Sequence, residues 1–362
     1  MNFIIHFQQV NKFFHVEKAR KNKILVLEKI KKSNFMFTLG IESTAHTLGI
    51  GIVQNGKIIS NIYDIYKPIN EGIVPRKAAD HHAVLFAEIL KKNLEKAELQ
   101  IKDLDLIAFA QGPGIGAPLR TGIVLAKYIA KKYDKPLIGV NHAYAHAKIS
   151  EHITKLKNPL YLYVSGGNTQ LFVEERAREK IVFHVLGETL DIGLGNLFDT
   201  FGRNIGLKYA HGSVLSELAK NGKYTELPYS VKGMNLVFSG LLTHASQLAK
   251  ICRKEDITYS LMETAFAMTC EVSERALFLT KKKKLVACGG VAQNKRFQEM
   301  LKIMCSENKV KFGVAPDEFN RDNGAMIAYA GEILYKKYGT KSIEEWEAIQ
   351  DYRIDKRFLE EN

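Results

Sequence analysis

The sequence lacks a recognisable membrane span and a secretory signal. No stretch of its 362 residues approaches the roughly 18 uninterrupted apolar residues that cross a bilayer, and the opening MNFIIHFQQVNKFFHVEKARK has no small-residue cleavage site. The four cysteines contain no C-x-x-C pair, so neither a zinc knuckle nor a disulfide framework is indicated. We therefore expect a cytoplasmic protein in a reducing compartment, without a membrane partner.

Acidic residues are also in short supply. The chain has 39 Asp and Glu against 52 Lys and Arg, which gives a formal net charge of +13. Such a surplus attracts polyanions, but charge alone does not separate nucleic acid from an acidic protein. Residues 1–35 carry eight Lys or Arg and two Glu, and so contribute +6. Because Met36 stands directly before the first clear strand, this leader is either a basic arm or the result of a misassigned start.

Two similar β-hairpin units predict two related lobes. The first is FTLGIEST with LGIGIVQNGKIIS, where Asn55-Gly56 supplies a tight turn, and the second is PLYLYVSGGNTQLFVEERAREKIVFHVLG. They lie about 120 residues apart, which indicates an internal repeat. Strands alternate with helices after each unit, so we expect α/β lobes with mostly parallel sheets and ligands at the carboxyl ends of strands.

Small, glycine-rich turns follow the predicted strands. They are GIESTAHT, QGPGIGAPLRTG, SGGNT and CGGVAQN. Glycine lets backbone N–H groups approach a phosphate closely, although it also serves simple turn geometry. Four such turns favour a nucleotide-like ligand between two lobes. None matches the P-loop or the dinucleotide-binding pattern, so those folds are disfavoured.

A pair of histidines indicates a metal site. His142 and His146 are four residues apart in NHAYAHAKIS, so on a helix both imidazoles lie on one face, within reach of one ion. The alternative is a pair of core or capping histidines. Asp322 in RDNGAM is the best remote candidate for a third ligand, although a helix N-cap would also explain it. Ala143 replaces the glutamate of H-E-x-x-H, which argues against a zinc protease.

Nine ordered motifs resemble one known family. They closely resemble the TsaD/KEOPS family of tRNA threonylcarbamoyltransferases, over about Met36 to Gly339, and LYVSGGNTQ is most similar to its archaeal and eukaryotic branch. The motifs are GIESTAHT, PRKAADHH, GPGIGAPLRTG, NHAYAH, LYVSGGNTQ, GETLDIGLGNLFD, MNLVFSGLLT, GGVAQNKR and RDNGAM.

The resemblance implies an actin/Hsp70-like (ASKHA) α/β fold with an interlobe nucleotide and metal site. The implied parts are a leader at 1–35, an N-terminal lobe at 36–160, a C-terminal lobe at 161–339 and a tail at 340–362. The implied reaction transfers a threonylcarbamoyl group from threonylcarbamoyl-AMP to N⁶ of the adenosine 3′ of the anticodon, in tRNAs reading codons that begin with A. The implied partners are tRNA, a separate KEOPS kinase subunit and the small KEOPS subunits, because the tail is too short for the kinase domain fused to some members.

The resemblance also assigns site residues. It implies one divalent metal ion per subunit, with Fe²⁺ favoured over Zn²⁺, held by His142, His146 and Asp322, with Tyr163 as a further ligand or substrate contact. No residue is assigned as a general acid or base. The implied substrate contacts are Tyr163, Val164, Ser165, Gly166 and Gly167 around the phosphate and carboxylate, and Asp199, Gly212, Ser216 and Asn294 around the nucleoside.

The chain departs from the family pattern at several positions. Ala210-His211 replace the usual Pro-Gly, and Ser216 stands where Glu is expected. Asn235 replaces the usual Asp, and Lys77 replaces the usual Glu. Ser216 and Lys77 leave room for a non-catalytic scaffold within a KEOPS-type assembly, whereas the intact histidine pair with Asp322 argues against it. A small-molecule kinase of the same superfamily is a weaker alternative, since it would not need the histidine pair.

Overall fold

The first lobe is built on a five-stranded mixed sheet. The computed structural model describes residues 36–68, 72–177 and 180–356, so the basic leader lies outside the described residues. The strand order is β3-β2-β1-β4-β5, with antiparallel pairing in the hairpins and parallel pairing of β1, β4 and β5. The strands are β1 (Phe37–Glu42), β2 (Thr47–Gln54), β3 (Lys57–Ile65), β4 (Leu106–Gly112) and β5 (Leu137–Asn141). Asn55 and Gly56 form the turn between β2 and β3 with positive φ, as predicted.

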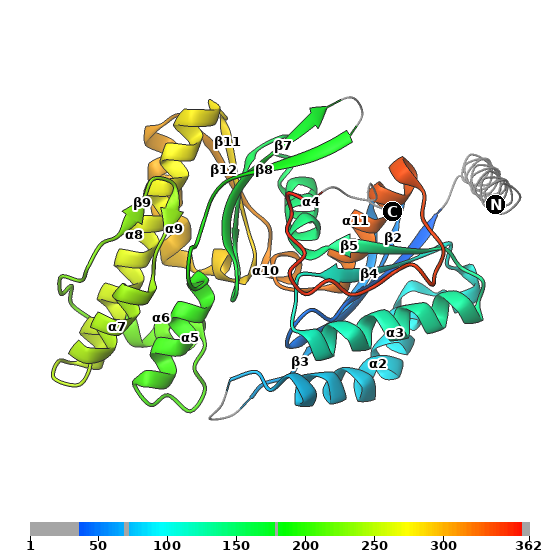
Figure 1. Cartoon of the computed structure of the whole chain (residues 1–362), viewed down its shortest axis with the longest axis horizontal. Helices are drawn as coiled ribbons and strands as arrows, with labels where there is room; N and C mark the ends of the chain where they lie inside the picture. Colours follow the sequence, from blue (N-terminus) through cyan, green and yellow to red (C-terminus); the bar gives the residue numbers. More distant parts are fainter. Residues whose placement is uncertain (1–35, 69–71, 178–179, 357–362) are drawn as a thin grey trace, which may run out of the picture.

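The second lobe repeats this plan. Its sheet has the order β12-β11-β6-β7-β8, again with an antiparallel hairpin pair beside parallel strands. The strands are β6 (Leu160–Val164), β7 (Thr169–Ala177), β8 (Lys180–Glu188), β11 (Lys284–Cys288) and β12 (Lys311–Val314). The internal repeat predicted from the two hairpin units is therefore confirmed, and Figure 1 shows the two lobes side by side.

Helices cover both faces of the first sheet. Helices α2 (Pro75–Ala97) and α3 (Gly116–Lys132) pack together below it in Figure 1, and α11 (Gly324–Tyr338) lies on the other face against β1 and β2. Glycine makes that close approach possible, because a Cβ at Gly51 would lie 2.2 Å from the backbone nitrogen of Ala325. The 3₁₀ turn η1 (Ile101–Asp103) precedes β4.

The second lobe carries most of the remaining helices. Its core combines β6 and β11 with the long helix α8 (Lys254–Thr280) and with α5 (Leu194–Asn204) and α9 (Lys295–Glu307), and a separate two-stranded hairpin contacts β8. Further elements of this lobe are α6 (Gly212–Ala219), β9 (Val231–Lys232), β10 (Asn235–Leu236), α7 (Ser239–Leu248), η2 (Gly290–Gln293) and α10 (Asp317–Asn320). Within the described residues, no helix is long and apolar enough to cross a membrane.

The end of the described chain returns to the first lobe. Helix α11 follows the second sheet in sequence but packs against the first, and Trp346 and Tyr352 are buried in the first lobe's core. The backbone N–H of Ile349 donates to the carbonyl of Gln111 at the end of β4, at 2.8 Å. The domain limits given above remain a prediction: β6 begins at Leu160, beside the proposed limit at 160, whereas residues 324–356 pack on the N-terminal sheet.

Candidate metal centre and interlobe cavity

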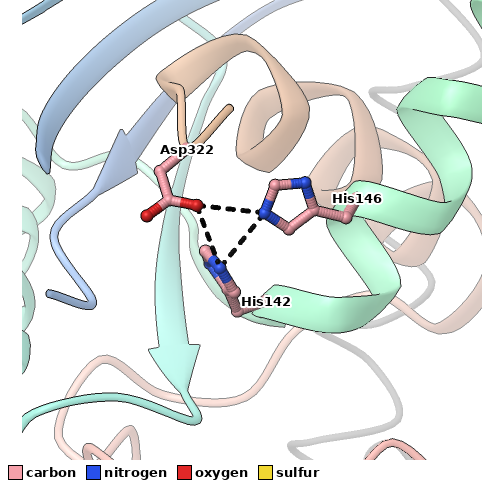
Figure 2. Close-up of side chains that lie close together, drawn as sticks. All are labelled: His142, His146 and Asp322. Carbon is pink, nitrogen blue, oxygen red and sulfur yellow. Dashed lines mark hydrogen bonds and ion pairs between the residues drawn. The ribbon is translucent and has the colours of Figure 1, made fainter. Parts of the chain in front are cut away.

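Helix α4 (His142–Thr154) begins immediately after β5 and carries both histidines. Asn141, the last residue of β5, caps the helix by accepting a hydrogen bond from the Tyr144 backbone N–H at 3.1 Å. The cap starts the helix at His142, so His142 and His146 are one helical turn apart. Both side chains are buried. The predicted pairing of the two imidazoles on one helical face is thus present (Figure 2).

Asp322 completes a compact group of three ligand atoms. Its Oδ1 lies 3.1 Å from Nε2 of His146 and 3.4 Å from Nε2 of His142, and the two Nε2 atoms are 3.2 Å apart (Figure 2). All three atoms lie within 4.8 Å of one another. Two imidazole nitrogens with one carboxylate oxygen form a donor set that suits Fe²⁺ or Zn²⁺. The residues present therefore fit a divalent metal ion.

Asp322 is not the N-cap of the following helix. Asn323 has that role, because its Oδ1 accepts the backbone N–H of Met326 at 3.0 Å. The capping explanation for Asp322 is therefore removed, and its carboxylate points at the two imidazoles, as Figure 2 shows. The residues predicted as ligands from opposite halves of the sequence are brought together here.

Glu42, which the sequence did not reveal as a site residue, contacts the Nδ1 side of the His142 ring. The fully buried carboxylate lies at the end of β1, and its Oε2 is 2.9 Å from Nδ1 of His142. Its Oε1 accepts the backbone N–H of Thr44 at 2.7 Å. A carboxylate on the second nitrogen of a metal-binding imidazole fixes the ring and directs the first nitrogen at the ion. The signal that could have identified Glu42 from the sequence is a carboxylate at the end of a buried strand, in GIEST.

Two carboxylates and two imidazoles control the protonation of the site. Burial acts to lower the pKa of His142, but the carboxylates of Glu42 and Asp322 outweigh it and raise the pKa to about 10. Burial acts to raise the pKa of Asp322, yet His142 and His146 hold it well below its usual value. Without a metal, His142 therefore remains protonated between the carboxylates of Glu42 and Asp322. A bound cation would displace that proton.

Replacing Glu42 by glutamine is expected to weaken the binding of a divalent metal ion about 10–100-fold, the usual effect of losing a carboxylate partner of a metal-bound histidine. The change keeps the size of the side chain and removes its charge. Competition titrations with Zn²⁺, and with Fe²⁺ without oxygen, measure the affinity. Glu88→Gln, which removes a carboxylate of an exposed pair with Lys92 on α2, is the control. Equal affinities in the two variants would contradict the role of Glu42.

Tyr163 lies beside the histidines at the end of β6. Its ring centroid is 5.3 Å from that of His146 and 6.4 Å from that of His142. Burial raises the pKa of its phenol well above the usual value, so the hydroxyl keeps its proton without a metal. Its role as ligand or substrate contact remains a prediction. Val164, the next residue, is fully buried and does not line the cavity described next.

A cavity of about 1390 Å³ opens between the lobes beside this centre. Parts of both lobes line it, including the β1–β2 turn, the loop after β3, the start of α4 and residues 350–354 at the end of the described chain. His142 and Asp322 lie in its wall, whereas His146 does not. The predicted substrate contacts that do line it are Tyr163, Ser165, Gly166, Gly167, Asp199, Gly212, Ser216 and Asn294.

The predicted nucleoside contacts lie close to one another. The Asn294 amide donates to the Ser216 hydroxyl at 2.8 Å, and this hydroxyl donates to the Gly212 carbonyl at 2.8 Å. Burial raises the pKa of Asp199 to about 6, although the Gly212 backbone N–H and Arg203 act to lower it. Two other residues depart from the family pattern. Lys77 is exposed on α2, and the side chain of Asn235 accepts a hydrogen bond from the Glu188 backbone N–H at 3.0 Å.

One family of known sequences matches most of the chain. The family described as "TsaD: tRNA N6-adenosine threonylcarbamoyltransferase" matches residues 56–329. A tRNA N6-adenosine threonylcarbamoyltransferase from Thermococcus sibiricus is 49% identical over 323 residues, which are 88% of this chain and 98% of that protein. A probable bifunctional tRNA threonylcarbamoyladenosine biosynthesis protein from Methanocaldococcus jannaschii is 46% identical over 88% of this chain and 59% of that protein.

Solved structures support the fold. HypF from T. kodakarensis matches 84% of this chain and 48% of its own with a TM-score of 0.60 at 15% identity. Component A of the (R)-2-hydroxyglutaryl-CoA dehydratase from Acidaminococcus fermentans matches 83% of this chain and 98% of its own with a TM-score of 0.52 at 18% identity. These neighbours have the ASKHA-type architecture, so the predicted two-lobe fold is confirmed.

Proposed function

Because the chain belongs to the TsaD family of tRNA N6-adenosine threonylcarbamoyltransferases, and is thus a transferase of tRNA threonylcarbamoyladenosine synthesis, we propose the specific reaction that it carries out. Threonylcarbamoyl-AMP donates its threonylcarbamoyl group to N⁶ of the adenosine 3′ of the anticodon, in tRNAs reading codons that begin with A. The observation that carries this proposal is the three-ligand centre, of which His142 and Asp322 lie in the wall of a cavity lined by both lobes.

The three candidate ligands would hold an ion that could help to orient the donor. We assign His142, His146 and Asp322 as ligands of one divalent ion, with Fe²⁺ preferred over Zn²⁺ and with Tyr163 beside them. A bound ion supplies positive charge that polarises a substrate oxygen and offsets negative charge developing at the carbamoyl group. Glu42 and the Asn141 cap keep the imidazoles of α4 in place, so the ligands are organised before substrate arrives.

The glycine turn after β6 is suited to the donor's anionic groups. A Cβ at Gly167 would meet no atom within 4 Å, and one at Gly166 would meet only the Asn196 side chain, at 3.4 Å. The backbone of this turn is therefore open to the cavity, where Ser165, Gly166 and Gly167 can approach a phosphate or carboxylate. Tyr163 and the buried Val164 anchor the turn at the end of β6.

The nucleoside is assigned to the second-lobe side of the cavity. With a pKa of about 6, Asp199 is mostly ionised at neutral pH and accepts hydrogen bonds from a ribose diol. Gly212, Ser216 and Asn294 lie along the same wall. Ser216 keeps this wall polar where the family pattern has Glu, since it is hydrogen-bonded to Asn294.

The test is transfer of labelled threonine to tRNA. We expect the purified, metal-loaded chain to modify tRNA when the donor is supplied, and repeated turnover to require a separate KEOPS-type kinase subunit and small subunits. A tRNA with guanosine in place of the acceptor adenosine is the control and should remain unmodified. No transfer even with all partners present would favour the non-catalytic scaffold. Efficient repeated turnover by the chain alone would contradict the need for partners.

A further inference from the structure

The interlobe cavity is larger than one nucleotide requires. Pockets for small ligands usually enclose about 300–1,000 Å³, whereas this cavity encloses about 1390 Å³. The donor contacts proposed above use the wall around Asp199 and Asn294 and the turn after β6. They leave the side formed by the β1–β2 turn, residues 65–68 and residues 209–211 without an occupant. The cavity therefore has room for a second substrate group.

Two aromatic rings lie stacked on this side. The rings of Tyr209 and His211 are nearly parallel, at an interplanar angle of 9° with centroids 5.7 Å apart, and Tyr209 is 39% exposed. Nδ1 of His211 accepts the backbone N–H of Ser213 at 3.3 Å, which caps α6 and leaves the ring proton on Nε2. Burial lowers the pKa of His211 below its usual value, which keeps the ring neutral. The pair thus presents a flat neutral surface with one N–H donor.

Charged groups of both signs lie near the stacked pair. Lys67 on the first lobe and Arg321 on the second act electrostatically on His211, and Asp199 acts on Tyr209. Arg321 is paired with Asp317 at 2.6 Å, whereas Lys67 is exposed. At the other end of the cavity, Glu188 is paired with Arg353 at 3.3 Å. The exposed Lys67 is a cation on the Tyr209 side that can pair with an RNA phosphate.

We propose that Tyr209 and His211 form the stacking site for the purine base of the acceptor nucleoside, with Lys67 placed for an adjoining phosphate. The inference rests on the proposed transfer to a tRNA adenosine. A base in a single-stranded loop is recognised by turning it out of its stack onto aromatic side chains, and a cationic groove follows the backbone. Tyr209 and His211 line the same cavity as Asp199, a proposed donor contact that acts electrostatically on Tyr209, so a base stacked here would share the cavity with the donor.

The first measurement is direct binding and needs no transfer. 2-Aminopurine replaces the acceptor adenosine in an anticodon stem-loop; its fluorescence rises when it leaves the base stack and is quenched again when it stacks on an aromatic ring. The probe should remain quenched in complex with the wild-type chain and with Tyr209→Phe, and Tyr209→Leu should lose this quenching and give a bright complex. His211→Asn keeps a good helix cap and removes the ring, so it should also lose most of the quenching. Tyr224→Leu changes an exposed tyrosine outside the cavity and should behave as wild type.

The second measurement separates the acceptor from the donor. At saturating donor, Tyr209→Leu should raise KM for tRNA about tenfold or more, the loss expected for one stacked base, while the Kd for AMP changes less than about twofold. Unchanged quenching and unchanged KM for tRNA would overturn the proposal. Weaker AMP binding with normal KM for tRNA would also overturn it, by assigning the pair to the donor base. If the wild-type chain transfers nothing, the proposed function fails, but the quenching result still decides the stacking site.

Discussion

Asp322→Asn is expected to abolish high-affinity metal binding and to lower transfer at least a hundredfold, while the metal-free protein still folds and melts at a lower temperature than wild type, because the ion pair with the buried His142 is lost. Asparagine keeps the shape of the side chain and removes the anionic oxygen that lies 3.1 Å from His146 and 3.4 Å from His142. Losing a direct ligand should cost more than the roughly 10–100-fold typical of losing its hydrogen-bonding partner. Metal content after dialysis, transfer to tRNA and a thermal melt of the metal-free protein measure the three effects.

The structure removes the main competing explanation for such a result. If Asp322 capped α11, asparagine would cap it equally well and nothing would change, but Asn323 is the cap. Asp317→Asn is a matched control in the neighbouring helix, because it removes a carboxylate paired with Arg321 on the surface. His146→Ala should reproduce the loss of metal and transfer. Normal metal content together with normal transfer in Asp322→Asn would refute the metal-site assignment.

Spacing between neighbouring residues was sufficient to predict the histidine pair, but not the carboxylate of Glu42 that contacts His142. His142 and His146 lie on one face because of the helical period, which is a property of a few neighbouring residues. Glu42 reaches His142 only because β4 brings β1 and β5 into one sheet, 100 residues apart in sequence. No local sequence pattern indicates that Glu42 and His142 lie in contact. The sequence GIEST shows a carboxylate at the end of a strand, but it does not show that His142 is its partner.

The position of α11 shows the same limit at the level of the fold. Its apolar residues predict a buried helix, and both sheets could receive one. Helix α11 packs on the first sheet because Gly40 and Gly51 let its backbone approach the strands closely. A Cβ at either glycine would lie 2.2 Å from helix atoms. Those glycines precede α11 by more than two hundred residues, so the match between them becomes visible only in three dimensions.

Lys148 connects helix α4 to the second lobe. Its Nζ lies 2.6 Å from a carboxylate oxygen of Glu151 and 2.5 Å from one of Glu174 on β7, and the Tyr161 hydroxyl on β6 donates to Glu151 at 2.7 Å. The start of the same helix is held by the first lobe, because Asn141 donates to the Tyr352 carbonyl at 2.9 Å. Helix α4 therefore connects the two lobes at the point where it carries the histidines.

Lys148→Met is expected to lower the free energy of unfolding by about 3–5 kcal/mol, the usual cost of leaving buried charges without their partner. Methionine retains most of the packing, but the two carboxylates then face each other with exposed fractions of only 17% for Glu151 and 6% for Glu174. Urea denaturation at pH 7 measures the change. Lys92→Met breaks an exposed pair with Glu88 on α2 and should cost less than about 1 kcal/mol. Equal losses in the two variants would contradict the buried network.

Acidification should reduce the difference in unfolding free energy between Lys148→Met and the wild type. Burial acts to raise the pKa of Glu151, but Lys148 outweighs it and holds the pKa below 4.5, so this carboxylate stabilises the wild-type fold above pH 4.5 and loses that effect as the pH falls through its folded pKa. Without the lysine, burial and the neighbouring carboxylate raise the pKa in the variant, whose folded state then gains protons and stability on acidification. The difference in unfolding free energy should therefore shrink between pH 7 and pH 4. A difference that stays constant over this range would show that methionine destabilises the helix through packing alone, and not by leaving Glu151 and Glu174 unpaired.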